Sequence, residues 1–309
     1  MEYIYLFIAC AFFAMQFIFQ KLFEKRTKGG LSVCLWNALV CTLVTMTVLA
    51  VRSGLPTESN GYVILIAALY SASGLICTIA SITAMSRGNV ASLGTFCLAG
   101  GMILPFVYGI LALNEEAGLF KWLGIIVLLL SLIPSVMSKS GQSKMDARFA
   151  FYASVVFVTN GFVSIFSAMH QKSPQAIDGD GFLFIAALIR LTACIVIILT
   201  IAGFRKAKGN SGVLKSAFWE IGKDKMTGIM FLILLVFAGS YAVCNTLGNI
   251  FSLRCLLTMD ASLQFPILSA VVIVLTALFG RIFFGEKITR NTWISLAMSV
   301  LGIGLFMLN

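Results

Sequence analysis

The chain has 309 residues, of which 60% are hydrophobic and only 11% are charged, and its mean hydropathy is +1.00. Soluble domains keep about a quarter of their residues charged and about half apolar, so this composition excludes a water-soluble globular protein and predicts one whose solvent is lipid. The formal net charge of +10 does not indicate a nucleic-acid partner, because nearly all charged residues lie in short segments between apolar runs, the usual signature of membrane topology.

Ten apolar runs follow one another along the chain, each close to the roughly 20 residues that a helix needs to cross about 30 Å of hydrocarbon. Their hydrophobicity is continuous and does not alternate as in barrel strands, so we expect an all-α integral membrane protein. The first run follows Met1 and Glu2 without the basic region of a signal peptide, and we expect it to remain as a span. The ten predicted transmembrane helices are Tyr3–Gln20, Leu31–Val51, Tyr62–Met85, Val90–Leu113, Leu119–Met137, Phe149–Met169, Phe182–Phe204, Met226–Leu253, Ala261–Gly280 and Thr292–Leu308.

The Lys and Arg residues outside these spans are distributed unevenly, with 17 in the odd-numbered connections and 4 in the even-numbered ones. The positive-inside rule therefore predicts that the odd connections are cytoplasmic and that both termini lie outside. In the longest connection, Arg205–Lys225, apolar residues share one helical face. This pattern favours a short interfacial helix, with an unstructured basic loop as the alternative.

The two halves of the sequence align with each other. An offset of 167 residues, which becomes 170 after a three-residue insertion, pairs Ser73 with Ser240, Cys77 with Cys244, Arg87 with Arg254, Ala91-Ser92-Leu93 with Ala261-Ser262-Leu263, and Glu116 with Glu286. The matches divide the chain into repeats 1–142 and 143–309, each with five predicted helices. Because five is odd, the second repeat must enter the membrane from the opposite side. Inverted repeats of this kind are typical of secondary transporters.

The last two predicted helices, with the sequence ASLQFPILSAVVIVLTALFGRIFFGEKITRNTWISLAMSVLGIGLF, resemble the closing pattern of a known transporter family. The pattern has a polar helix start, an interior Pro266, the pair Gly285-Glu286, and two glycines, Gly302 and Gly304, in the final helix. It is that of the ten-helix EamA-like branch of the drug/metabolite transporter superfamily. The resemblance implies two inverted five-helix repeats and a transport function, but it is nearly silent on the substrate.

Weaker similarities to the same family lie elsewhere in the chain. The first half resembles the pattern more loosely at Asn114-Glu115-Glu116 and Gly124, and Ala187-Leu188-Ile189-Arg190 resembles an Ala-Ala-Leu-Arg stretch of the second helix of a repeat. The first half departs there, with Cys41 at the aligned position. The resemblance also implies a cavity lined by helices 1, 3, 4, 6, 8 and 9.

Polar side chains in the centre of a membrane helix are costly unless they are paired or face a cavity. Tyr241, Asn245 and Asn249 recur every four residues and therefore stripe one face of the eighth predicted helix, which makes them the leading substrate contacts. Interhelical hydrogen bonding is the alternative for each candidate, and a change at Thr42 is expected to matter less. The candidate substrate-binding residues are Gln16, Gln20, Tyr70, Thr95, Asn160, Tyr241, Asn245, Asn249 and Gln264.

Charged residues at or inside the spans are expected to be structural or to act in gating. Arg190 is the charged residue that lies well inside a predicted span. Its guanidinium stays protonated, so it needs an acceptor partner or, as the alternative, an anionic ligand. Glu116 and Glu286 end the fourth and ninth predicted helices, where solvation or pairing with lysines is expected rather than ion coupling. Asp260 is expected to cap the ninth helix by accepting hydrogen bonds from its first N–H groups.

The sequence has one histidine, no paired carboxylates at membrane depth and no phosphate-binding glycine loop. We therefore expect neither an enzyme, nor a cofactor, nor a metal site. The expected function is a secondary transporter that moves a small polar or zwitterionic metabolite, of the amino acid, nucleoside or sugar class, by alternating access. The alternatives are a quaternary-ammonium or drug carrier with cation–π surfaces, and a non-transporting scaffold or lipid-binding subunit. The expected partners are a small-molecule substrate and the lipid bilayer of a bacterial plasma membrane, and no nucleic acid.

Overall fold

The computed structural model describes residues 2–27, 31–85, 90–137, 147–207, 228–285 and 290–308, and within these ranges the chain forms ten helices and no β-strand. The all-α prediction is confirmed for this part of the chain. Each predicted span coincides with one helix, and the interfacial helix predicted within Arg205–Lys225 lies mostly outside the described residues. The helices are α1 (Glu2–Arg26), α2 (Leu31–Ser53), α3 (Gly61–Met85), α4 (Val90–Ala112), α5 (Leu119–Met137), α6 (Ala147–Gln171), α7 (Gly179–Ala207), α9 (Gly228–Leu256), α10 (Ala261–Phe284) and α11 (Arg290–Phe306).

Eight of these helices are long and apolar enough to cross a membrane, and α5 and α11 contain shorter apolar stretches, Leu119–Pro134 and Trp293–Phe306. Large apolar side chains cover the outside of the bundle, among them Phe7, Ile133 and Val300. So many exposed large apolar side chains are unusual on a soluble monomer, whereas lipid tails solvate them. The chain therefore has the build of a multi-pass α-helical membrane protein.

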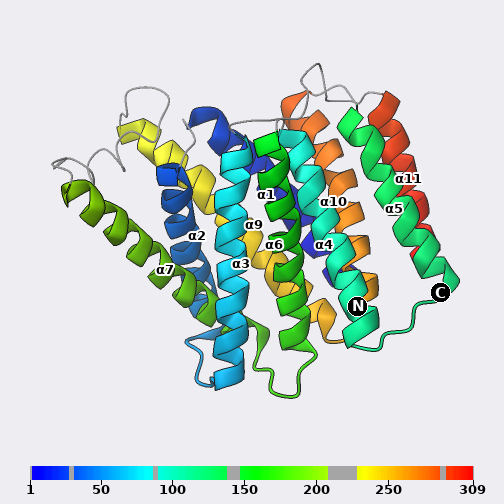
Figure 1. Cartoon of the computed structure of the whole chain (residues 1–309), viewed down its shortest axis with the longest axis horizontal. Helices are drawn as coiled ribbons and strands as arrows, with labels where there is room; N and C mark the ends of the chain where they lie inside the picture. The colour runs from blue at the N-terminus through cyan, green and yellow to red at the C-terminus, as the bar shows by residue number, and fades with distance from the viewer. Residues whose placement is uncertain are drawn as a thin grey trace.

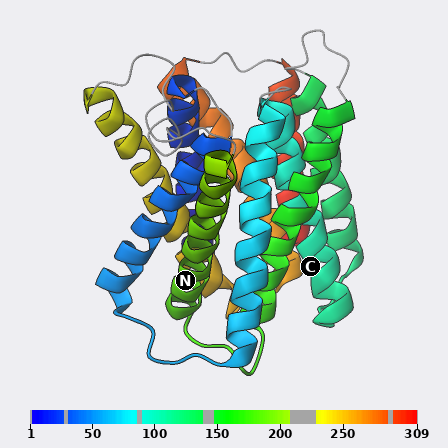
Figure 2. The same ribbon diagram turned by 60° about the vertical axis from the view of Figure 1, so that its left-hand side comes forward.

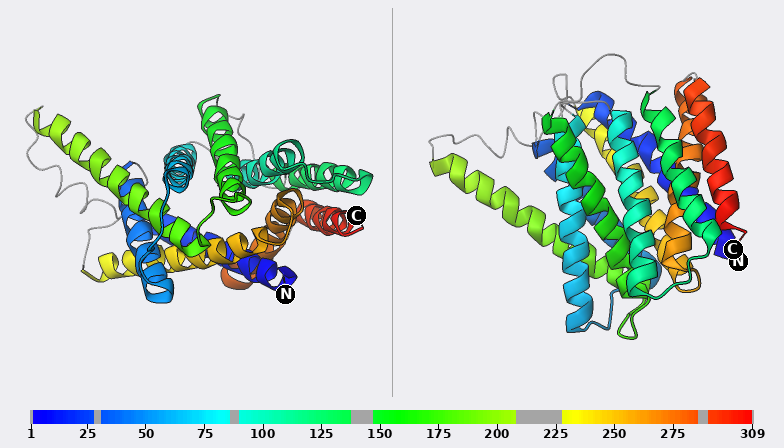
Figure 3. Two further views of the ribbon diagram at one scale, coloured as in Figure 1. Left: turned by 90° about the horizontal axis from the view of Figure 1, so that it is seen from below. Right: turned by 45° about the vertical axis from the view of Figure 1, so that its right-hand side comes forward.

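The helices run up and down across one bundle (Figure 1). The described connections 54–60, 113–118, 172–178 and 257–260 all lie at the end of the bundle that is lowest in Figure 1, which we call the lower end. Both chain termini lie toward that end (Figure 3). Helix α7 packs between α2 and α3 (Figure 2) and leans away from the bundle toward its C-terminus (Figure 3).

The main contacts join a helix of residues 1–142 to a helix of residues 143–309. Helix α1 packs along α9 and α10, α6 along α3 and α4, and α7 along α2 and α3, while α2 also contacts α9, α4 contacts α10, and α5 contacts α11. Two apolar clusters fill these interfaces, one between α3, α7 and α9 around Phe182, the other between α1, α4 and α10 around Met102. The two halves therefore share their core.

Small residues allow the closest helix crossings, as expected where lipid replaces water as the solvent. A Cβ on Gly100 of α4 would overlap the backbone carbonyl of Phe157 in α6, and one on Gly161 would lie 2.7 Å from the Cβ of Leu104. In the α5–α11 pair, a Cβ on Gly124 would lie 2.6 Å from the Phe306 ring, and one on Gly302 would lie 2.6 Å from Leu128. These glycines fix how near the helices approach.

Candidate functional site

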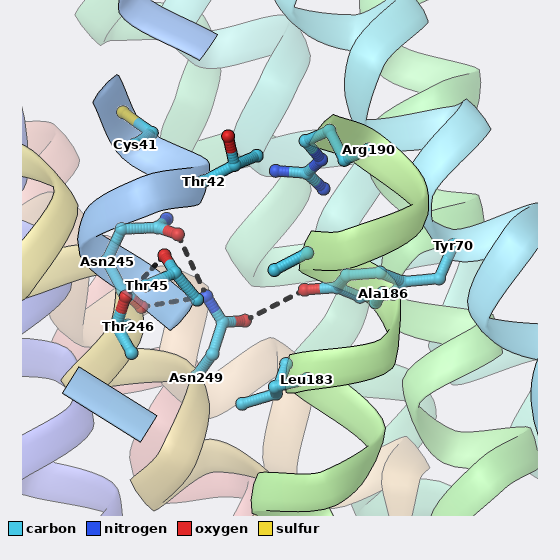
Figure 4. A pocket seen from close by; sticks show the side chains of 11 residues that line it. Cys41, Thr42, Thr45, Tyr70, Leu183, Ala186, Arg190, Asn245, Thr246 and Asn249 are labelled. Atoms are coloured by element: carbon cyan, nitrogen blue, oxygen red, sulfur yellow. Dashed lines mark hydrogen bonds between the residues drawn. The ribbon is translucent and has the colours of Figure 1, made fainter. Parts of the chain in front are cut away.

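A small polar cavity lies between α2, α3, α7 and α9 (Figure 4). Most of its side chains carry a hydroxyl, an amide or a guanidinium, and none of them is a carboxylate. The lining residues are Cys41, Thr42, Thr45, Tyr70, Leu183, Ala186, Ala187, Arg190, Asn245, Thr246 and Asn249. Polar side chains inside a membrane helix bundle are costly unless they are paired or face a cavity, so this cavity is the candidate site.

Four of the predicted substrate contacts form a continuous chain of hydrogen bonds beside this cavity. Asn245 Nδ2 donates to Gln16 Oε1 of α1 at 2.9 Å. Asn249 Nδ2 donates to the Asn245 carbonyl oxygen at 2.8 Å and to Asn245 Oδ1 at 3.2 Å. Tyr70 Oη of α3 donates to Asn249 Oδ1 at 3.4 Å. We call Gln16, Asn245, Asn249 and Tyr70 the amide chain. It links α1, α9 and α3, as the spacing of four residues on α9 predicts for one helix face.

Arg190 of α7 lines the same cavity, and its Cζ lies 5.9 Å from the centre of the Tyr70 ring. A Cβ on Gly74 of α3 would overlap the guanidinium, so a larger residue there would require the arginine side chain to move. The side chain points toward Thr42 of α2 (Figure 4). Its Nε is buried without a hydrogen-bond partner among the described residues. The cation therefore stands in the cavity wall without a carboxylate of the described chain beside it.

Helix α2 contributes the part of the wall that the sequence did not predict. Thr45 and Thr246 share a hydroxyl–hydroxyl hydrogen bond of 2.7 Å between α2 and α9. Thr42, at which we expected a change to matter less, is a lining residue. Its hydroxyl donates to the carbonyl oxygens of Ala38 at 3.0 Å and Leu39 at 2.9 Å. The available signal was the recurrence of Cys41, Thr42 and Thr45 in an apolar helix. The family resemblance pointed instead to helices 1, 3, 4, 6, 8 and 9.

Other candidate residues hold helices together away from the cavity wall. Gln264 of α10 is fully buried and donates to the backbone oxygen of Ser252 in α9 at 2.8 Å and to its hydroxyl at 3.0 Å. Asn160 of α6 donates to the carbonyl oxygen of Cys97 in α4 at 2.8 Å. Both side chains join two helices, which is the alternative that we gave for every candidate.

Three further candidates stand outside the lining. Gln20 donates to Glu24 one turn later on its own helix, at 2.8 Å. Tyr241 is half-buried on α9, one turn before Asn245, and Thr95 is half-buried on α4. The cavity therefore brings together Tyr70, Asn245 and Asn249, with Gln16 bonded to its edge.

The N-terminus of α10 is capped in a different way from the one expected. Asp260 occupies the N-cap position with φ −66° and ψ 141°, but its side chain makes no capping hydrogen bond. Instead, Glu115 of the 113–118 connection accepts from the Ala261 N–H at 2.8 Å and from the Ser262 N–H at 2.7 Å. The expectation for Asp260 is therefore wrong, because the carboxylate of Glu115, distant in sequence, accepts the hydrogen bonds of these free N–H groups instead.

The Asp260 carboxylate lies 3.6 Å from Lys121 Nζ instead. That ammonium group also donates to the backbone oxygen of Glu116 at 2.6 Å. The Glu116 side chain is exposed at the lower end, which fits the expected role at a helix end. Glu286 lies outside the described residues.

Ten helices packed across a shared core, eight of them long and apolar enough to cross a membrane, define a multi-pass α-helical membrane protein with a polar cavity between four of its helices. No protein-family model and no curated protein matches the sequence. One solved crystal structure is similar over 99% of this chain and 96% of its own, with a TM-score of 0.68 at 13% sequence identity. At that identity the similarity concerns the fold alone.

Proposed function

We propose that this chain is a secondary transporter that moves a small polar or zwitterionic metabolite, of the amino acid, nucleoside or sugar class, by alternating access. Its ten helices all span the membrane, as two inverted five-helix repeats over residues 1–142 and 143–309. The observation that carries the proposal is the polar cavity itself, which takes two helices from each half. Binding at the interface of two repeats is the usual arrangement in such carriers.

The exchange of packing partners supports the repeat. When α1 to α5 are matched in order with α6, α7, α9, α10 and α11, the contact α1–α9 becomes α6–α3, α1–α10 becomes α6–α4, and α2–α9 becomes α7–α3. The contacts α2–α7, α4–α10 and α5–α11 each map onto themselves. Every one of these contacts is present, so a two-fold relation between the halves accounts for the packing.

The α5–α11 pair supports the count of ten spans. These helices have 19 and 17 residues, and their apolar stretches are shorter than the roughly 17 to 25 residues of an ordinary span, so the support comes from their pairing with each other. Ser295 of α11 donates to the carbonyl oxygen of Ser131 in α5 at 2.5 Å, and Ser299 donates to the Ser131 hydroxyl at 3.1 Å. Hydrogen bonds between buried hydroxyls are typical of neighbouring membrane helices.

The chemistry of the cavity favours a neutral or zwitterionic ligand. Amides and hydroxyls donate and accept without carrying charge, as do Asn245, Asn249 and Thr246. A quaternary ammonium would place a second positive charge in a cavity that already holds Arg190, which costs free energy. The drug-carrier alternative is therefore disfavoured. The polar cavity also favours a carrier over a non-transporting scaffold, for which a tightly packed apolar centre is expected.

Polar contacts between the two halves gather at the lower end, which supports alternating access. Asp180 of α7 lies 3.3 Å from Arg52 Nε of α2, and it accepts a hydrogen bond from Ser53. Asn60 donates to the Gln175 carbonyl oxygen at 3.0 Å. Together with the Glu115 cap of α10, these contacts tie the halves together at this end. They have to break for the cavity to open there.

The test is uptake by the full chain reconstituted in liposomes, using a panel of labelled amino acids, nucleosides and sugars. We expect saturable accumulation of one class, abolished by Asn249→Leu and kept by Asn291→Ala, which changes an asparagine outside the cavity on α11. No uptake above that of protein-free liposomes for any class would contradict the proposed function.

A further inference from the structure

The cavity holds one full charge and no counter-charge from its own lining. Arg190 is the single ionised residue among the eleven that line it, the rest being amides, hydroxyls, a thiol and apolar groups. An arginine in this setting cannot escape the cost of burial by losing its proton. It needs an acceptor, and the described chain forms no ion pair with it.

The surroundings of Arg190 orient the guanidinium and leave part of it open to the cavity. One side lies over the Tyr70 ring, and another lies against the bare backbone of Gly74. The side chain points toward the Thr42 hydroxyl (Figure 4), which donates to its own helix, and no hydrogen bond joins the two residues in the described structure. The guanidinium is therefore held at one side of the cavity, and the Asn245 and Asn249 side chains lie at the other (Figure 4).

We infer that Arg190 binds the carboxylate of the ligand, so that the site takes a small carboxylate-bearing metabolite whose remaining polar groups face Asn245 and Asn249. A guanidinium matches a carboxylate with two parallel N–H donors. One positive charge balances one carboxylate, whereas a phosphate dianion would leave a negative charge uncompensated in the cavity. This inference rests on the proposed function, because transport would be the role of the site, but ligand binding alone tests it.

The experiment measures ligand-induced thermal stabilisation of the full chain in lipid nanodiscs. The probes are matched pairs that differ in the carboxylate: L-alanine and L-alaninamide, L-serine and L-serinamide, lactate and lactamide, with inorganic phosphate added as a separate anion. We expect at least one carboxylate to raise the Tm while its amide partner and phosphate do not. No stabilisation by any carboxylate, or equal stabilisation by an acid and its amide, overturns the inference. Stabilisation by phosphate equal to that by the best carboxylate overturns the preference for a carboxylate over other anions.

Three variants locate the effect on Arg190. Arg190→Gln removes the charge and should weaken binding of the stabilising carboxylate at least tenfold. Gly74→Ala keeps the charge but places a methyl group where the guanidinium lies. It should also weaken binding, and it remains informative if Arg190→Gln does not fold, because a flexible side chain can move aside. Arg254→Gln makes the same chemical change on an exposed arginine of α9 and should bind as wild type does. Unchanged carboxylate binding in Gly74→Ala and Arg190→Gln overturns the inference.

Uptake of the same carboxylate into liposomes separates the two proposals. A protein that binds the carboxylate through Arg190 but does not carry it contradicts the proposed function and leaves this inference standing. A protein that carries a sugar or nucleoside, and whose binding ignores Arg190→Gln, supports transport and overturns the carboxylate site.

Discussion

Glu115 caps a helix that begins 146 residues later, at Ala261: its Oε1 accepts a hydrogen bond from the Ala261 N–H at 2.8 Å. The second carboxylate oxygen accepts from Ser262 at 2.7 Å, so two free N–H groups of α10 are satisfied by one side chain. A carboxylate at a helix N-terminus is also favoured by the helix dipole. The contact joins the first half of the chain to the second at the lower end.

Glu115→Ala should lower the free energy of unfolding by about 1 kcal/mol, as the loss of a helix cap does. The measurement is thermal unfolding of the full chain in detergent micelles. Glu58→Ala is the matched control, since Glu58 is exposed in the 54–60 connection. An equal change in Tm for the two variants would show that the cap contributes nothing to stability.

Gly109→Ala should destabilise the protein by the same route. Its Cβ would overlap Oε2 of Glu115 and lie 2.9 Å from the Ser262 nitrogen. Alanine in a helix is otherwise favoured over glycine by about 1 kcal/mol, so a net loss identifies the displaced carboxylate as the cause. In the Glu115→Ala background, Gly109→Ala should cost less than in wild type, because coupled sites are not additive. If the losses of stability in the two variants are additive, Gly109 and Glu115 act independently.

Asn245→Ala should raise the apparent Kd of the transported ligand several-fold. The Asn245 side chain lines the cavity, so the variant removes an amide that a ligand there would hydrogen-bond, and a lost neutral hydrogen bond costs about 0.5–1.5 kcal/mol. Equilibrium binding with the substrate found in the liposome panel measures the effect. Asn291→Ala on α11 is the control, because Asn291 does not line the cavity. A change at Thr42 cannot serve as the control, because Thr42 does line it. Equal ligand affinity for wild type and Asn245→Ala would show that the amide chain only joins helices and does not contact the ligand.

The lower end should face outward, as the 17-to-4 charge distribution predicts. In a background without native cysteines, an impermeant thiol reagent added outside intact cells should label Glu58→Cys in the 54–60 connection. It should leave Ser211→Cys unlabelled until the cells are permeabilised; residue 211 lies outside the described part of the chain. Labelling in the opposite order would reverse the orientation.

The helices were predictable because membrane thickness fixes how long an apolar run has to be. The site was predictable only in part. Asn245 and Asn249 were found from their spacing on one helix, which is a local property. The roles of Thr42 and Arg190 depend on which neighbour each helix face meets, and the sequence of one helix does not contain that information.

The cap of α10 shows the same division. Asp260 has the residue type and position of an N-cap, and a reading of local sequence therefore selects it. The residue that accepts the hydrogen bonds, Glu115, becomes a neighbour only when α4 packs against α10. Lys121 at the start of α5 then engages the Asp260 carboxylate. Competition between distant groups for one helix end cannot be decided from either segment alone.

The cavity wall takes α2 and α3 from residues 1–142 and α7 and α9 from residues 143–309, so neither half of the chain holds a complete site. Under the proposed function, a ligand in the cavity would touch both halves at once. Its binding free energy would then depend on how one half sits against the other, so that occupancy and rearrangement would form a single linked equilibrium. On the same proposal, cutting the chain between α5 and α6 would leave two fragments that bind nothing separately and regain binding only as a pair.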